Sequence, residues 1–145
     1  MPATATAGRG YLLDVPVYLE PLQPTPNPRV IERWRRVGEL RMAVSALIVC
    51  DALAQLEERD SKRVWAAWRA LLEGRFRWVD VGSEVSAAFR EIGAGSGGSA
   101  PEGFRRMDRV HGATARAHGL ILATTRPAVF AGMPGVATED WAQPL

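Results

Sequence analysis

The sequence predicts an α/β fold in which helices cover both faces of a central parallel sheet, a three-layer α/β/α architecture. Short apolar runs alternate along the chain with longer segments of helical periodicity, and this alternation is typical of parallel strands joined by helical crossovers. The length of 145 residues suits one compact domain that can bury its own core. We therefore expect a single domain over residues 10–145, preceded by a flexible tail at residues 1–9.

In the first half of the chain, apolar runs predict two strands and capping residues mark the helices. Asn27 and Pro28 make a good helix start, because Asn caps a helix and Pro fits its first turn. The prolines before them exclude long regular structure. The predicted elements are a strand over residues 11–15, a helix from Pro28 that Gly38 ends, a strand over residues 40–45, a helix capped by Ser45, and a helix capped by Asp60 or Ser61 that runs up to Gly74.

The second half of the chain continues the alternation of strands and helices. The segment over residues 93–99 is rich in glycine and serine, a composition that predicts a flexible connection. It lacks the following Lys-Ser or Lys-Thr of a phosphate-binding loop, so that alternative is not favoured. The predicted elements are a strand over residues 76–81, a helix capped by Ser83, a helix over residues 102–117 that ends at His118-Gly119, a strand over residues 120–124, and an irregular tail.

The composition predicts a soluble, cytoplasmic protein. Cys50 is the single cysteine, which excludes an intrachain disulfide, and we expect it to be a small buried residue. No apolar stretch is long enough to span a bilayer, and the first residues lack the centre of a secretion signal. Of the 18 basic residues, only Lys62 is not arginine. Arginine suits phosphate binding, but solvated helix faces explain the same composition equally well.

Three acidic residues, Asp14, Asp51 and Asp108, are expected to meet at one edge of the sheet. Asp14 closes the first strand, Asp51 lies early in the helix after the second strand, and Asp108 lies on the helix before the last strand. Ligands of open α/β sheets bind beyond the carboxyl ends of the strands. Carboxylates gathered there would raise one another's pKa values and would suit a divalent cation such as Mg²⁺. Singly, each could instead cap a turn, face solvent or pair with an arginine.

The residues around these acids resemble the motifs of PIN-domain ribonucleases, in particular VapC-type toxins. The first motif of that family reads Leu-Leu-Asp-Thr-Asn-Val, and residues 11–17 here read YLLDVPV. The family's second acid is a Glu six residues beyond a Ser that ends a strand, and Asp51 stands six residues beyond Ser45. The third and most specific motif corresponds to MDRVHGATARAHGLILATT, which begins at Met107.

This resemblance implies a PIN-like fold and a metal-dependent endoribonuclease that is the toxin of a VapBC-type toxin–antitoxin pair. It implies that Asp14, Asp51 and Asp108 are the catalytic, metal-binding residues for Mg²⁺ or Mn²⁺. Asp14 and Asp108 would hold the cation, and Asp51 would orient or deprotonate the attacking water. The implied partners are an RNA substrate, a cognate antitoxin and a second copy of the chain in a homodimer, with no membrane.

Several positions depart from the family pattern. Val15 and Pro16 replace the Thr-Asn pair after the first acid, and Val129 stands where the family has a fourth acid. Arg126 adds a positive charge nearby, which could bind RNA phosphate as a substrate-binding residue or take the place of a cation. The alternative function is therefore a degenerate PIN domain that binds a partner or RNA with little or no cleavage.

Two histidines near the third motif have alternative interpretations. His111 lies three residues after Asp108 and shares its helix face, yet a surface histidine beside Arg109 is the more common situation. His118 stands at the end of the same helix, where we expect it to act as a C-terminal cap. On sequence grounds alone, Asp14→Asn is expected to leave thermal stability equal or higher, because it removes one of several mutually repelling carboxylates.

Overall fold

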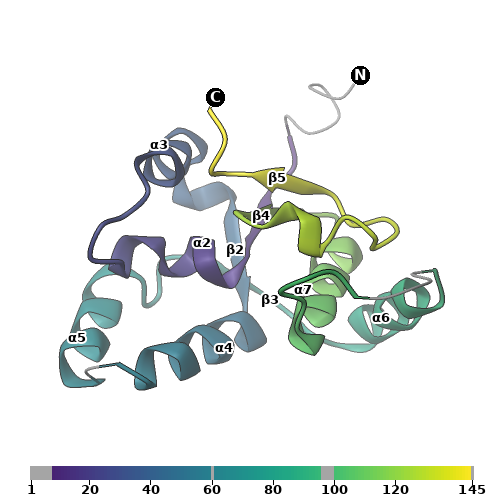
Figure 1. Ribbon diagram of the computed structural model, residues 1–145, viewed down its shortest axis with the longest axis horizontal. Helices are drawn as coiled ribbons and strands as arrows, with labels where there is room; N and C mark the ends of the chain where they lie inside the picture. The colour runs from purple at the N-terminus through teal and green to yellow at the C-terminus, as the bar shows by residue number, and fades with distance from the viewer. Residues whose placement is uncertain (1–7, 60, 96–99, 145) are drawn as a thin grey trace.

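The computed structural model describes residues 8–59, 61–95 and 100–144, and within them a five-stranded parallel sheet forms the centre of the fold (Figure 1). The strands are β1 (Tyr11–Leu13), β2 (Met42–Ser45), β3 (Arg77–Val79), β4 (Ile121–Thr124) and β5 (Thr138–Asp140), and the helices are α2 (Val15–Leu19), α3 (Pro28–Val37), α4 (Ala46–Glu57), α5 (Ser61–Leu71), α6 (Ser83–Gly95) and α7 (Arg106–Ala117). Residues 1–7 of the predicted tail and residues 96–99 of the predicted loop lie outside the described residues.

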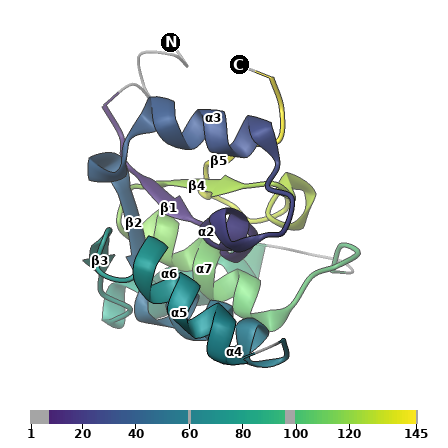
Figure 2. The same ribbon diagram turned by 90° about the vertical axis from the view of Figure 1, so that its left-hand side faces the viewer.

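The strand order is β3-β2-β1-β4-β5, and all the neighbouring strands run parallel. The chain therefore moves outward in one direction from β1 to β3 and then crosses to β4 and β5 on the other side. Right-handed crossovers place the helices of these two halves on opposite faces of the sheet. In Figure 1, α6 and α7 lie together on the right of the view, and α2, α3 and α5 lie on the left, the side that faces the viewer in Figure 2. The expected three-layer α/β/α architecture is confirmed.

The reversal of direction makes the gap between β1 and β4 the topological switch point, where α/β folds bind ligands. The interior of the fold is continuous apolar packing around these two strands, with Leu12, Leu13 and Leu122 fully buried. Tyr11 at the start of β1 packs edge-on against the ring of the buried Trp141, with 5.5 Å between the ring centroids. A rigid pair of strands thus supports whatever lies at their carboxyl ends.

Two elements were not expected from the sequence. Helix α2 occupies part of the proline-rich passage, because Pro16 stands in its first turn, where a missing N–H costs nothing. Strand β5 adds an edge strand from residues Thr-Glu-Asp, which carry no apolar alternation. The predicted helix over residues 102–117 begins at Arg106, and the strand predicted over residues 76–81 spans only β3.

Cys50 is exposed, so the expectation that it is buried was wrong. Its neighbours on α4, Val49 and Ala52, are buried instead.

Within the described ranges, none of the helices combines the length and the apolar character needed to cross a bilayer.

Candidate functional site

The structure brings Asp14, Asp51 and Asp108, here called the acid cluster, together at the carboxyl edge of β1. Asp14 directly follows β1 and caps α2, its Oδ1 accepting a hydrogen bond from the Val15 backbone N–H at 2.9 Å. Asp108 stands in the first turn of α7, and Asp51 stands midway along α4. The side chains of Asp14 and Asp108 are fully buried, and that of Asp51 is 13% exposed. The expected meeting of three acids at one place is therefore observed.

The Arg126 guanidinium lies between Asp14 and Asp108 and bonds both carboxylates. Its Nε and Nη2 donate to Oδ2 and Oδ1 of Asp14, each at 3.1 Å. Its Nη1 and Nη2 donate to Oδ2 and Oδ1 of Asp108 at 3.1 and 2.6 Å. Arg126 is placed here because it follows β4, where its backbone N–H donates to the Thr124 hydroxyl at 3.0 Å. That hydroxyl in turn donates to Asp14 Oδ2 at 2.8 Å.

A second arginine, Arg105, joins Asp51 to the cluster. Its Nη1 and Nη2 donate to the two oxygens of Asp51 at 3.0 and 2.8 Å, the bidentate geometry that strengthens such pairs. Its Nη2 also lies 3.3 Å from Asp108 Oδ1, and its backbone N–H donates to Asp108 Oδ2 at 2.8 Å. Asp51 is one methylene shorter than the Glu of the motif, and Arg105 bridges the gap. The sequence predicted only that an acid could pair with an arginine, and it did not identify Arg105 as the partner of Asp51.

His111 is buried inside the site rather than exposed beside Arg109. Its ring is fully buried, and Nε2 lies 3.2 Å from Oδ2 of Asp51. Its Nδ1 has no hydrogen-bond partner among the described residues. Burial lowers the pKa of His111, and the hydrogen bond that His111 donates to Asp51 does not restore it. His111 is thus neutral at neutral pH and donates from Nε2. The helical spacing from Asp108 was the signal that placed it near the site.

The arginines, rather than repulsion between the acids, dominate the charge state of the cluster. Burial is the largest single influence and raises the pKa of Asp108, but the hydrogen bonds from Arg126 and from the Arg105 backbone, together with the charges of the two arginines, bring the net pKa below the ordinary value. Burial likewise raises the pKa of Asp51, and the bonds from Arg105 and His111 bring the net pKa below normal. The expectation that clustering raises these pKa values is wrong for Asp51 and Asp108. Both are ionised at neutral pH.

The pKa of Arg126 is raised in turn, although burial alone lowers it, because Asp108 and Asp14 accept its hydrogen bonds. Every carboxylate oxygen of the acid cluster therefore accepts at least one hydrogen bond from within the chain. The positive charge between Asp14 and Asp108 is the guanidinium itself.

These residues do not fit a divalent cation in the arrangement described. Mg²⁺ demands free oxygen ligands in near-octahedral geometry, and the oxygens facing each other here are held by Arg126 and Arg105. Across the part of the chain that the structure describes, no group of three His, Cys, Asp or Glu side chains is arranged to hold a metal ion. The residues that depart from the motif also offer no oxygen ligand for a cation. Pro16 lies in α2, and Val129 is buried in the turn after Arg126.

An open cleft of about 630 Å³ lies beside the acid cluster. Its lining includes both arginines of the cluster, a residue of α2, and residues near and just after the end of α4. The side chain of Arg105 is 42% exposed and that of Arg126 is 24% exposed, so both guanidiniums are reachable from the cleft. The residues that line it are Pro16, Gln55, Glu58, Arg59, Arg105 and Arg126.

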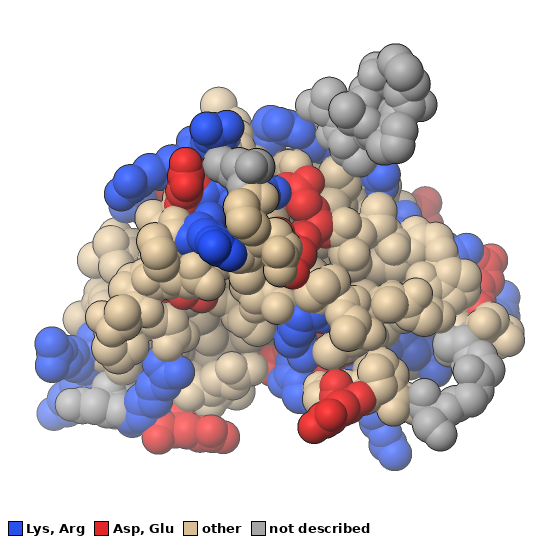
Figure 3. Space-filling view, turned by 45° about the horizontal axis from the view of Figure 1, so that its top comes forward, with Lys and Arg blue, Asp and Glu red and all other residues tan. Residues whose placement is uncertain are grey.

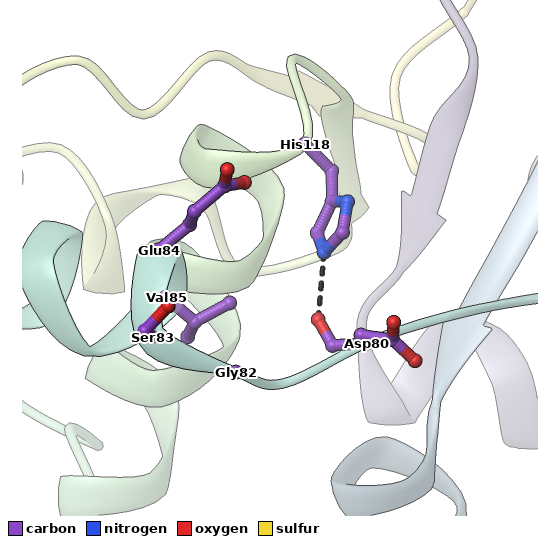
Figure 4. Close-up of a pocket in the computed structure, with 6 residues that line it drawn as sticks. All are labelled: Asp80, Gly82, Ser83, Glu84, Val85 and His118. Atoms are coloured by element: carbon purple, nitrogen blue, oxygen red, sulfur yellow. Dashed lines mark hydrogen bonds between the residues drawn. The ribbon is translucent and has the colours of Figure 1, made fainter.

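A second hollow, of about 290 Å³, surrounds His118 (Figure 4). His118 is the C-cap of α7, as expected, and its Nε2 lies 2.6 Å from the backbone oxygen of Asp80. Figure 4 shows the carboxylates of Asp80 and Glu84 apart from each other on either side of this contact. The histidine joins the end of α7 to the segment before α6, which is a structural role.

The lowered pKa of His111 makes stability depend on pH. The unfolded chain binds a proton at the ordinary value of 6.5, and the folded chain binds it only at lower pH. The contribution of neutral His111 is therefore complete above pH 6.5 and is lost as the pH falls toward the folded pKa. We expect the midpoint temperature of thermal unfolding to decrease as the pH is lowered from about 7.5 to about 5.5, roughly one unit on either side of the ordinary value.

His111→Gln keeps a donor for Asp51 and cannot titrate, so it should flatten this part of the pH profile. His118→Gln is the matched control, because it removes a histidine at the far end of α7, outside the acid cluster. Thermal melts of the three proteins across this range measure the effect. An equal slope in the wild type and in His111→Gln would contradict the assignment of the titrating group.

Comparison with known families identifies the class of domain. Residues 11–134 match the family model described as PIN domain. No sequence among the curated proteins matches the chain. Solved structures of the same fold include FitAcB from Neisseria gonorrhoeae, which is 23% identical with a TM-score of 0.75 and covers 92% of this chain and 99% of its own.

Two further structures have lower identity. A toxin–antitoxin complex from Klebsiella pneumoniae is 16% identical with a TM-score of 0.66, and the match covers 94% of this chain and 100% of that one. VapC20 from Mycobacterium tuberculosis, described as a sarcin-ricin loop cleaving toxin, is 15% identical with a TM-score of 0.62, covering 88% and 98%. At these identities the likeness extends to the fold, whose expected form is thereby confirmed.

Proposed function

The chain belongs to the PIN-domain family, and we propose that it acts as a binding subunit of toxin–antitoxin type with little or no metal-dependent cleavage of RNA. The observation that carries this proposal is the Arg126 guanidinium, which bonds Asp14 and Asp108 at 2.6 to 3.1 Å. Members of the family generally act as nucleases through divalent cations. In this chain a covalently attached cation occupies the space between two of the acids.

The physical argument is one of competition. A metal ion would have to displace a guanidinium that satisfies four carboxylate oxygens, and the displaced charge would stay tethered a few ångströms away. Repulsion between Arg126 and the incoming ion then opposes binding, as does the second guanidinium, Arg105, on Asp51 and Asp108. Supporting side chains are absent as well, since Val15 and Pro16 offer no polar group toward the site.

The proposed partner is a cognate antitoxin protein. Structural neighbours that include a toxin–antitoxin complex support this choice through the shared fold. We further propose a cytoplasmic location, a homodimer and a single PIN-like domain over residues 10–145. Sedimentation of the purified chain at several concentrations tests the homodimer.

A second candidate is the metal-dependent endoribonuclease, and one specific observation favours it. The three acids that the motif implies as metal ligands do meet at the switch point, joined through Arg126 and Arg105. When bound, Mg²⁺ or Mn²⁺ would supply Lewis-acid activation of water. For this candidate both arginines must leave the carboxylates before a cation enters, and RNA phosphate in the cleft is the anion that could draw them away.

Manganese titration separates the two candidates. We expect isothermal titration calorimetry of the wild-type chain to show no saturable Mn²⁺ binding tighter than about 1 mM. Cleavage of a fluorescent RNA should be equally slow with Mn²⁺ and with a chelator, and Asp14→Asn should not change it. Micromolar Mn²⁺ affinity together with cleavage that Asp14→Asn abolishes would overturn the proposal in favour of the nuclease.

A further inference from the structure

Three arginines lie at the amino-terminal ends of the strands, at the opposite end of the sheet from the acid cluster. Arg9 precedes β1, Arg41 precedes β2, and Arg77 is the first residue of β3. The pairing registers place Tyr11 opposite Met42 and Ala43 opposite Arg77, so these positions stand side by side at the amino ends of three adjacent strands. We call Arg9, Arg41 and Arg77 the arginine row. Nothing in the proposed function uses it.

Backbone contacts hold the arginine row close together around Gly10. The Arg41 Nη2 donates to the Arg9 backbone oxygen at 2.6 Å, and the Arg9 Nε donates to the Gly119 oxygen at 3.1 Å. A Cβ on Gly10 would lie 3.3 Å from the Arg41 oxygen and 3.9 Å from Nη2 of Arg77. The guanidinium of Arg77 therefore reaches across β2 to the start of β1.

The arginine row has no acidic counterpart. Within the described ranges, no carboxylate lies within 4.0 Å of any of its three guanidiniums, whereas six other arginines form such pairs. Glu139 of β5 is already bonded to Arg33 at 2.5 Å and to the Tyr11 hydroxyl at 3.0 Å. The ring of Tyr11 offers Arg41 only a cation–π contact, at 5.4 Å from the ring centroid.

Like charges held together without a counter-charge raise the free energy of the folded state. The contrast with the acid cluster is sharp, because there each buried carboxylate is neutralised. Figure 3 shows Lys and Arg side chains along the upper edge of that view, with acidic groups set between some of them. An external anion that spans several guanidiniums would relieve the repulsion within the row.

We propose that the arginine row binds the phosphodiester backbone of a single-stranded polynucleotide. The planar fork of arginine bonds phosphate in two-point fashion, and three forks in line across two strand spacings cover about 10 Å. A chain with repeated phosphates fits such a line better than a single small anion, which could engage only one or two forks. The row lies at the opposite end of the sheet from the acid cluster, so binding there is independent of cleavage.

Fluorescence anisotropy with a labelled 20-nucleotide single-stranded RNA tests the proposal. The variant carries Arg9→Gln, Arg41→Gln and Arg77→Gln. We expect its affinity to fall at least tenfold and the slope of log K against log salt to become shallower by about 2, from three lost phosphate contacts at about 0.7 each. The matched control carries Arg63→Gln, Arg69→Gln and Arg90→Gln, which removes the same charge from exposed sites on α5 and α6 and should lose less than threefold.

Three further arms make the outcome decisive. A DNA strand of the same sequence tells whether the 2′-hydroxyl matters, and binding of either strand that depends on the row supports the proposal. A polyglutamate peptide of equal charge that binds as tightly as RNA would overturn it, and so would equal losses in the variant and in the control. Arg77→Gln alone removes no hydrogen bond among those of the described residues, so it should fold normally and reduce the slope by about 0.7. An unchanged slope in that variant would also overturn the proposal.

Discussion

Replacing Arg126 by methionine is expected to destabilise the folded chain by about 3 kcal/mol, the lower part of the range for removing one member of a buried ion pair. Methionine preserves most of the side-chain volume and removes the charge. Asp14 and Asp108, both fully buried, would then face each other with no cation between them. Chemical denaturation of the wild type and of the variant measures the difference in the free energy of unfolding.

A matched control separates lost charge from lost packing. Arg116 is 28% exposed, close to the 24% of Arg126, but its partner Glu91 is 59% exposed. Arg116→Met should therefore cost less than about 1 kcal/mol, because exposed pairs contribute little. Adding Asp14→Asn and Asp108→Asn to Arg126→Met should recover much of the loss, since the uncompensated charges disappear. Equal costs for Arg126→Met and Arg116→Met would mean that the acid cluster does not depend on Arg126.

The same contacts reverse the direction expected for Asp14→Asn from the sequence. Repulsion among acids predicts that this change leaves stability equal or higher. In the structure, Asp14 accepts two hydrogen bonds from Arg126, one from the Thr124 hydroxyl and one from the Val15 backbone N–H. An asparagine nitrogen would face donors at one of these positions. The expected effect of the single change is therefore a loss of stability.

The order of the main elements could be predicted because local signals agreed with the tertiary fold. Apolar runs, the caps Asn27 and Ser45, and the glycine after α3 all marked boundaries that the structure confirms. The two missed elements lack such signals. Helix α2 has five residues and is stabilised by the Asp14 cap and by packing of Val17 and Tyr18 in the core. Strand β5 owes its place to pairing with β4.

The position of the three acids could also be predicted, because the ends of strands and the starts of helices are local features. Their partners could not. Arg105 and Asp51 are separated by 54 residues, and Arg126 and Asp14 by 112. Sequence left open whether Arg126 binds RNA phosphate or replaces a cation, since both need a charge near the acids. The three-dimensional contacts show that the Arg126 guanidinium bonds two carboxylates.

Converting Arg126 to asparagine is expected to create metal binding that the wild type lacks. The change removes the guanidinium and frees the oxygens of Asp14 and Asp108 that it bonds. We expect Mn²⁺ to bind the variant at least tenfold more tightly than the wild type, which corresponds to about 1.4 kcal/mol. Binding to the folded state alone also raises stability, by about 2.7 kcal/mol at a hundred times the dissociation constant.

Thermal melts with and without Mn²⁺ therefore give a readout that does not depend on cleavage. The Arg126→Asn variant should melt at a lower temperature than the wild type without metal and recover when Mn²⁺ is added. Arg126→Asn combined with Asp108→Asn should lose that recovery, because one of the two freed carboxylates is gone, and Arg116→Asn should show no response at all. Recovery of the single variant only would identify Arg126 as the residue that keeps the cation out. A wild-type melting temperature that rises equally with Mn²⁺ would show instead that the metal already displaces the guanidinium, and the nuclease would then be the better-supported function.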